Sequence, residues 1–378
     1  MDLCHGTILV GIKIKLTLGV VIGIDVKWAH MDYSPGLRGI IAGETEISTV
    51  GMEGTSLRYR GYDAIELTKS HTYEDVASLI IDDSLDGKLF KETFSKHYEE
   101  LLRDEALLNL INNLKMNLHP MDVLRTAISY IGQADESNKL DAASKITAIS
   151  CIAIASYDKE PTSELNNDFV VASSLLPNTA SKEQLEALDD MLILYAEHGF
   201  NASTFAARVT ASTRSDLTSA IVSGVGTLKG ELHGGANEAA VELINSFDTP
   251  EDAEKGVHKL FEEKKKIMGF GHGVYKIQDP RSPVVKSWVE MLSKTNESIN
   301  KYEIAKKVDE IMDSEKNLFP NVDFYGGLLL SELGFAVDLF TPIFVTGRSV
   351  GWSAHYFEQR KQDTLIRPAA KYTGIQER

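Results

Sequence analysis

The spacing of apolar residues predicts helices over most of the chain beyond residue 62. Ser181 followed by Gln184 is the signature of a capping box, and apolar residues at helical spacing come directly after it. Thr249 before Pro250 marks another helix start, because proline is favoured at the first helical position. Similar spacing recurs later, with apolar positions at Val285, Trp288, Leu292, Ile304, Val308 and Ile311. The pattern therefore predicts a mostly α fold.

Two stretches depart from this amphipathic pattern. In residues 38–62, short β-prone runs alternate with glycines, which predicts a small β hairpin or two near the N-terminus. Residues 326–346 are apolar almost throughout, so we expect helices buried in a bundle or at a subunit interface. The glycine-rich segment 269–274, GFGHGV, follows charged FEEKKK instead of a hydrophobic strand. That context argues against a dinucleotide-binding or P-loop turn.

The first thirty residues form a segment of their own. They are apolar but contain Lys13 and Lys15, and the uninterrupted run 16–24 is much shorter than the roughly 20 residues that span a bilayer. No small-residue cleavage site follows, which argues against a signal peptide. Met31 offers an alternative start, so we interpret residues 1–30 as an extension that is either not native or disordered. We predict no association with a membrane.

Composition narrows the class of protein. The chain has 378 residues, which suits one large domain with a smaller companion. It carries 39 basic and 55 acidic residues, a net charge of -16, which argues against nucleic acid as a partner. The only cysteines, Cys4 and Cys151, argue against a disulfide scaffold and against a cysteine-ligated zinc. We therefore expect a cytoplasmic protein.

Candidate chemistry lies in three glycine-rich motifs. His233 stands in ELHGGAN, His272 in GFGHGVYK and Asp323 in PNVDFYGG. Glycine neighbours let the backbone approach a ligand closely. A carboxylate can remove a proton beside a carbonyl, and histidines can donate to the developing oxyanion or polarise a second carbonyl. Each residue alone is more often a core, loop or turn residue, and the spacing leaves open whether the three meet.

Arginines give a second signal. Arg348 stands in TGRSVGW within an apolar helical stretch, where a buried charge needs an anionic partner. Arg281 in QDPRSP and Arg367 in LIRPAA are also candidates, although a solvated turn or chain end explains them equally well. Because guanidinium groups pair bidentately with carboxylates, the three would suit a dicarboxylate substrate.

At these residues the chain resembles the citrate synthase family, over roughly residues 36–374. The resemblance rests on seven motifs in the family's order: LRYRGYD at 57–63, PMDVLRTA at 120–127, EHGFNASTFAAR at 197–208, LKGELHGGANEA at 228–239, GFGHGVYKIQDPR at 269–281, PNVDFYGG at 320–327 and LIRPAAKYTG at 365–374. It implies a two-domain helical fold and a homodimer. The large domain would comprise residues 31–236 and 327–378, and the small domain 237–326 would close over the substrates.

The resemblance also implies an activity, the condensation of acetyl-CoA with oxaloacetate and hydrolysis of citryl-CoA to citrate and CoA. By matching positions, Asp323 would be the base, His233 would stabilise the enol, and His272 would polarise the oxaloacetate carbonyl. The implied oxaloacetate ligands are His198, Asn201, Arg281, Arg348 and, from the other subunit, Arg367, with Ser203 supporting them.

Coenzyme A would be a substrate, and no cofactor would be bound permanently. Its phosphates need cations, which Lys264, Lys265 and Lys266 before the GFGHG loop could supply. Lys276 resembles a family position near coenzyme A, and the backbone of residues 267–269 (Ile267, Met268 and Gly269) resembles the strip that recognises adenine. Positive charge at a helix C-terminus is the alternative explanation for Lys264 and Lys265. Gly273 departs from the pattern, because many microbial relatives carry an arginine directly after the histidine of GFGH.

Three alternatives remain at this stage. A 2-methylcitrate synthase using propionyl-CoA differs by one methylene, which a pocket discriminates by only about 1–3 kcal/mol. A non-catalytic scaffold would retain the fold without activity. A metal enzyme would use the two histidines and the carboxylate as a facial triad and would contain stoichiometric metal.

Overall fold

The computed structural model describes residues 34–37, 39–158, 161–375 and 377. The chain separates into two units, residues 1–44 and Thr45–Arg378. The predicted extension, residues 1–30, lies outside the described residues, and the described part of the first unit holds a short 3-10 turn, η1 (Pro35–Leu37). Helices hold 62% of the described residues and strands 3%, which confirms the prediction of a mostly α protein.

A small antiparallel sheet opens the second unit, as the sequence predicts. Its strands run in the order β1 (Ser48–Val50), β2 (Leu57–Tyr59) and β3 (Tyr62–Asp63), with the 3-10 turn η2 (Met52–Gly54) after β1. Arg60 and Gly61 join β2 to β3 with φ angles of 47° and 88°. Positive φ at both central residues matches the right-handed twist of the flanking strands.

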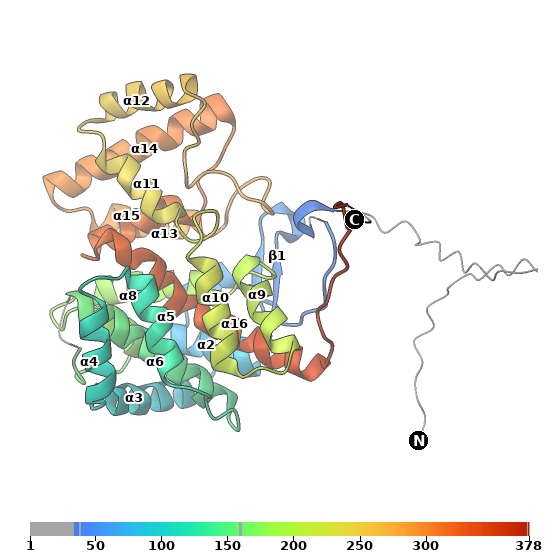
Figure 1. The fold of residues 1–378 in the computed structure, drawn as a ribbon. Coiled ribbons are helices and arrows are strands. Elements are labelled where there is room, and N and C mark those ends of the chain that lie inside the picture. Colours follow the sequence, from blue (N-terminus) through green and yellow to red (C-terminus); the bar gives the residue numbers. More distant parts are fainter. Residues whose placement is uncertain (1–33, 38, 159–160, 376, 378) are drawn as a thin grey trace, which may run out of the picture. The chain divides into compact units, whose positions relative to one another are not determined.

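Helices form the rest of the second unit (Figure 1). The first group is α1 (Ala64–Thr68), α2 (Tyr73–Asp82), α3 (Lys88–Leu102), α4 (Glu105–Leu114), α5 (Pro120–Tyr130), α6 (Lys139–Asp158), α7 (Val170–Leu175) and α8 (Lys182–Tyr195). The second group is α9 (Ala202–Ser212), α10 (Leu217–Leu228), α11 (Ala236–Asn245), α12 (Pro250–Glu262), α13 (Ser282–Leu292), α14 (Asn296–Lys316), α15 (Val322–Glu332), the 3-10 turn η3 (Val337–Leu339) and α16 (Phe340–Gln362).

Local sequence signals account for several helix starts. The Ser181 side chain accepts a hydrogen bond from the Gln184 backbone N–H, and the Gln184 side chain accepts one from the Ser181 N–H, so the predicted capping box opens α8. Thr249 caps α12 and Pro250 occupies its first turn, also as predicted. Both motifs satisfy N–H groups that a helix leaves without intrahelical partners.

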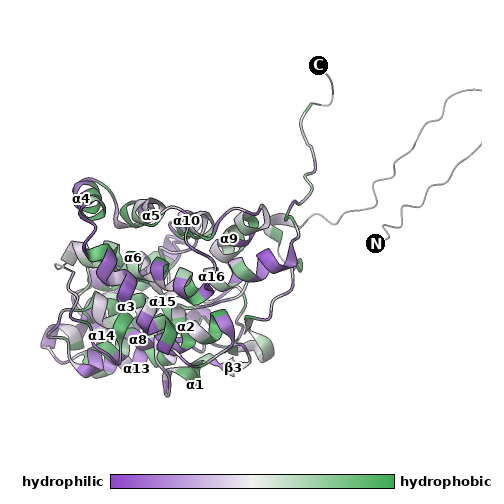
Figure 2. Cartoon of the chain, turned by 90° about the horizontal axis from the view of Figure 1, so that it is seen from below, coloured by the Kyte–Doolittle hydropathy of each residue, from purple (hydrophilic) through white to green (hydrophobic). Residues whose placement is uncertain are grey.

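Helix α16 forms the centre of the core. It packs against α2, α6, α8, α9 and α10, and nearly all of its residues are buried (Figure 1). Gly351 permits the contact with α8, because a Cβ there would lie 2.3 Å from the Ala196 carbonyl oxygen. Outer helices such as α3 and α14 carry both hydrophilic and hydrophobic residues (Figure 2). A helix buried on all sides therefore carries Arg348, which is only 1% exposed.

The apolar run 326–346 is helical but not continuous. Helix α15 ends at Glu332, and Gly334 then adopts a φ of 90° before η3 and the start of α16. Helices α11 to α15 pack among themselves through the pairs α13 with α15, α11 with α15 and α12 with α14. The division into domains at residues 236 and 327 stays a prediction. Within the described residues, no helix has the length and apolar character that crossing a bilayer requires.

Candidate active site

Two buried guanidinium groups mark the candidate site. Arg281, at the start of α13, donates from Nε and Nη2 to the carboxylate of Asp279 at 2.9 and 2.8 Å. Arg348 donates from Nε to the Tyr195 carbonyl oxygen at 2.6 Å. In the described part of the chain, no carboxylate lies within 4.0 Å of Arg348. Arg281 is thus neutralised in place, whereas Arg348 keeps a buried charge for which an anionic ligand is the natural partner.

His272 is held as a neutral hydrogen-bond donor. Its Nδ1 accepts hydrogen bonds from the backbone N–H groups of Val274 at 3.0 Å and Tyr275 at 3.1 Å. Because backbone N–H groups only donate, the ring proton must lie on Nε2. Burial lowers the pKa of His272 to about 4, and the charge on Arg281 acts in the same direction. At neutral pH the Nε2–H is therefore available to a substrate carbonyl.

His233 has the opposite tautomer. Its Nε2 accepts from the backbone N–H of Ser203 at 3.2 Å and lies 2.9 Å from the Ser203 hydroxyl, so the proton lies on Nδ1. The hydroxyl of Ser203 donates to Oδ1 of Asn201 at 2.8 Å, and Asn201 also caps α9. Burial, together with Arg348, lowers the pKa of His233 to about 4. Asn201 and Ser203 thus fix the ring that donates from Nδ1.

Asp323 lies in the first turn of α15, where the N-cap residue Asn321 accepts its backbone N–H at 3.0 Å. Burial raises the pKa of its carboxyl group to about 6, against the lowering effect of Arg281 and Arg348. A carboxylate with a pKa close to the working pH is ionised at neutrality and still accepts a proton readily. These properties suit a general base.

The charges of Arg281 and Arg348 act on the candidate histidines and on Asp323, which indicates that these residues surround one centre. Arg281 affects the pKa values of His198, His272 and Asp323, and Arg348 affects those of His198, His233 and Asp323. The His198 and His272 rings meet edge to face, with centroids 5.1 Å apart. The structure therefore brings together residues whose meeting the spacing in the sequence left open.

The remaining charged candidates have exposed side chains, and the charge of Lys276 also acts to lower the pKa of His272. Arg367 is exposed beyond α16, and no ion pair involves it within the described residues. Lys264 and Lys266 are exposed, Lys265 pairs with Glu263 at 2.7 Å, and Lys276 donates to the Gly273 carbonyl at 3.1 Å. Lys264 and Lys266 directly precede the 267–269 segment in the chain, and their exposed ammonium groups are available to an anionic ligand.

Backbone pairing positions the loop that carries His272. Gly271 donates to the Phe319 carbonyl at 2.8 Å, and Asn321 donates to the Gly269 carbonyl at 2.9 Å. Gly269 has a φ of 86°, and a Cβ there would lie 2.9 Å from the Phe324 side chain. This glycine therefore lets the loop lie directly against the start of α15, next to Asp323. Ile267 is buried and Met268 is half-buried.

Two residues of the candidate site, Asp279 and Tyr275, were not identified from the sequence. Asp279 is fully buried, and its Oδ2 also accepts the Val322 N–H at 3.0 Å, so it ties Arg281 to the start of α15. Its position two residues before Arg281 in the DPR motif was the available signal. Tyr275 is 1% exposed, and its hydroxyl lies 3.0 Å from Nε2 of His198. An aromatic residue in a glycine-rich loop gave no comparable signal.

Comparison with known proteins decides the family. A family model described as citrate synthase, C-terminal domain, matches residues 36–369. The chain belongs to the citrate synthase family. It is 38% identical to a 2-methylcitrate synthase of Shewanella oneidensis, covering 91% of this chain and 95% of that protein. It is 37% identical to a citrate synthase of Heyndrickxia coagulans, covering 90% and 96%.

A solved citrate synthase has the same fold. The enzyme from the thermophilic archaeon Thermoplasma acidophilum, in a ternary complex with carboxymethyl coenzyme A and oxaloacetate, aligns with a TM-score of 0.84. The two chains are 30% identical over 92% of this chain and 97% of that one. The likeness confirms the predicted citrate synthase-like helical fold.

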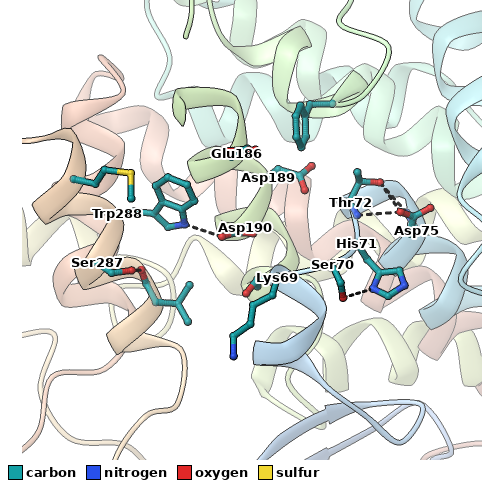
Figure 3. Close-up of a pocket in the computed structure, with 14 residues that line it drawn as sticks. Lys69, Ser70, His71, Thr72, Asp75, Glu186, Asp189, Asp190, Ser287 and Trp288 are labelled. Atoms are coloured by element: carbon teal, nitrogen blue, oxygen red, sulfur yellow. Dashed lines mark hydrogen bonds between the residues drawn. The ribbon is translucent and has the colours of Figure 1, made fainter. Parts of the chain in front are cut away.

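A separate cavity of about 590 Å³ lies between the α1–α2 connection, α8 and α13 (Figure 3). Its lining includes Lys69, His71, Asp189, Asp190 and Trp288 and none of the candidate catalytic residues. Across it, the indole N–H of Trp288 donates to Oδ2 of Asp190 at 2.7 Å. Burial raises the pKa of Asp190 to about 7, well above the ordinary value for aspartate. This carboxyl group should influence stability in a pH-dependent way.

We expect Asp190→Asn to stabilise the protein more at neutral and alkaline pH than at acidic pH. Because the pKa is raised, the folded state holds a proton between about pH 4 and pH 7 that the unfolded state has lost, so the parent loses stability as pH rises through this interval and loses no more above about pH 7. An amide oxygen still accepts from Trp288 and carries no charge. Urea unfolding should show the variant about 1–3 kcal/mol more stable than the parent at pH 8, and this difference should shrink as the pH is lowered from 7 towards 4. A difference independent of pH would contradict this explanation.

Proposed function

We propose that this protein condenses acetyl-CoA with oxaloacetate and hydrolyses the citryl-CoA formed to citrate and CoA. The observation that carries the proposal is one constellation: two neutral histidines that donate from defined nitrogens, and a buried carboxylate with a raised pKa, around Arg281 and Arg348. Membership of the citrate synthase family supports the reaction class.

In this mechanism the carboxylate of Asp323 removes a proton from the methyl group of acetyl-CoA. Charge then develops on the thioester oxygen, and the Nδ1–H of His233 donates to it, with Ser203 holding the ring. The Nε2–H of His272 polarises the ketone of oxaloacetate, and the enol carbon forms a bond to the ketone carbon. The ketone oxygen takes the His272 proton and becomes a hydroxyl. Water then cleaves the thioester and releases CoA.

Charge recognition would hold the dicarboxylate. Arg348 provides a buried guanidinium without a carboxylate partner among the described residues, and Arg281 retains Nη1 for a second contact. The His198 ring meets the His272 ring edge to face, and the charges of both arginines act on its pKa. We further propose a homodimer in which Arg367 of the second subunit completes the oxaloacetate site. Lys264, Lys266 and Lys276 would contact coenzyme A together with the backbone of residues 267–269.

A second candidate is 2-methylcitrate synthesis from propionyl-CoA. Relatives of similar identity carry both names, including a citrate/2-methylcitrate synthase of Bacillus subtilis that is 37% identical. The two reactions share the base, the donors and the dicarboxylate ligands. They differ only in one methylene of the acyl group, which makes the acyl donor the quantity to measure.

Release of free thiol tests both candidates. Purified protein receives oxaloacetate with either acetyl-CoA or propionyl-CoA, and omission of oxaloacetate is the control. We expect release that depends on oxaloacetate, and the ratio of kcat/KM for the two donors assigns the substrate. A folded protein that releases no thiol with either donor would refute the proposal and leave a non-catalytic role for the fold.

A further inference from the structure

The phenol of Tyr275 lies within the candidate site but has no part in the reaction described above. Tyr275 belongs to the loop between Gly269 and Arg281, and its side chain is 1% exposed. Its hydroxyl lies 3.0 Å from Nε2 of His198, and this is its only hydrogen bond in the part of the chain that the structure describes. A buried hydroxyl with one bond still has hydrogen-bonding capacity for a ligand.

Tyr275 connects two histidines that face the substrate. Its backbone N–H donates to Nδ1 of His272 at 3.1 Å and so helps to determine which ring nitrogen carries the proton. Its ring lies 4.6 Å from the His272 ring and 5.5 Å from the His198 ring, between centroids. The hydroxyl is therefore held by packing on both sides and cannot turn away without moving the loop.

The charges around the phenol are those expected to hold the dicarboxylate. Burial raises the pKa of Tyr275, and the charges that act on it are those of Arg281, Asp279 and Arg348. The phenol therefore stays protonated. His198 is neutral as well, because burial lowers its pKa far below the ordinary value. A buried, neutral O–H beside His198 is suited to donate to a carboxylate or ketone oxygen of a ligand bound there.

We propose that the Tyr275 hydroxyl is a further substrate-binding group, which donates a hydrogen bond to the bound 2-oxo dicarboxylate while it accepts one from His198. The inference rests on the proposed function, since it names an additional contact in the same site. Tyr275 orients the 2-oxo acid toward His272 and contributes nothing to recognition of the acyl-CoA.

Tyr275→Phe tests this contact, because it retains the ring and removes only the hydroxyl. We expect the KM for oxaloacetate to rise roughly 10-fold or more, since the buried partners lose a hydrogen bond. The KM for the acyl-CoA should change less than about two-fold. Calorimetric titration of oxaloacetate without acyl-CoA should show the same loss in affinity. Tyr302→Phe in α14, distant in sequence from the site motifs, is the matched control and should behave as the parent.

A second background separates direct contact from an effect through His198. In a His198→Asn protein, Tyr275→Phe should still lower the affinity for oxaloacetate, because the hydroxyl contacts the ligand itself. No further loss in that background would show that Tyr275 only orients His198, and would overturn the inference. So would a Tyr275→Phe protein with the parent KM for oxaloacetate.

Failure of the inference is distinguishable from failure of the proposed function. An active parent enzyme with an unaffected Tyr275→Phe variant overturns only the contact. A parent protein that neither releases thiol nor binds oxaloacetate overturns both. Circular dichroism and the thermal midpoint of each variant establish that the comparison is between folded proteins.

Discussion

Replacing Asp323 with asparagine is expected to lower turnover by at least about 100-fold, because the amide cannot accept the proton that the reaction removes. The substitution preserves shape. Asn321 accepts the backbone N–H of residue 323, so the start of α15 does not depend on the carboxylate. Burial already disfavours the ionised form of Asp323, and the variant should therefore be at least as stable as the parent.

Thiol release by the purified variant under saturating substrates measures this effect. Asp313→Asn, at an exposed position of α14, is a matched control and should retain turnover within about two-fold, as surface changes usually do. Turnover of Asp323→Asn close to that of the parent would refute the assignment of the base.

The pH dependence gives an independent check on the same residue. Asp323 acts as a base only when ionised, and burial places its pKa at about 6. In the parent, kcat/KM should therefore rise with pH through about 6 and level off above it. The residual activity of Asp323→Asn should lack this rise. A parent profile that rises instead near the ordinary pKa of aspartate would show that burial does not tune this carboxyl.

Replacing Arg348 with leucine should weaken the binding of oxaloacetate far more than the binding of the acyl-CoA. Arg348 is buried in α16 without a carboxylate partner within 4.0 Å in the described residues, so its charge is available to the substrate. Loss of a buried, charge-assisted contact should raise the KM for oxaloacetate roughly 100-fold, whereas the KM for the acyl-CoA should change by no more than a few fold.

Steady-state kinetics with each substrate varied in turn measures the two effects. Arg103→Leu, at an exposed position that pairs with Glu99, is the control for loss of an arginine and should leave both KM values unchanged. Leucine also removes a costly buried charge, so the Arg348→Leu protein should remain folded. An equal rise in the KM for both substrates would mean that Arg348 supports the structure instead of binding the dicarboxylate.

Most of the secondary structure could be predicted because its signals are local. The capping box of α8 and the Thr249–Pro250 start of α12 depend on hydrogen bonds between residues at most three positions apart. The buried run 326–346 was predicted as helical, but the break between α15 and α16 was not. Gly334 was its only local sign, and one glycine in an apolar run is compatible with an unbroken helix.

The candidate residues could be named from motifs, but their chemical states could not. Whether a histidine donates from Nδ1 or Nε2 depends on its partners. Ser203 lies thirty positions from His233, whereas the partners of His272 are its own neighbours in a loop that pairs with residues 319–321. Likewise, no pattern in the sequence established that Asp279 neutralises Arg281, or that Arg348 has no carboxylate partner within the part of the chain that the structure describes.

The sequence by itself determined the helical class, the small N-terminal sheet and the residue types that the chemistry requires, because these follow from short-range periodicity and from motifs. Only the tertiary structure decided that Asp323 is buried enough to have a raised pKa and that both histidines are neutral. It also placed the Tyr275 hydroxyl against His198. The physical reason is that burial and electrostatic fields arise from segments far apart in the chain, which meet only when α15, α16 and the loop before α13 pack together.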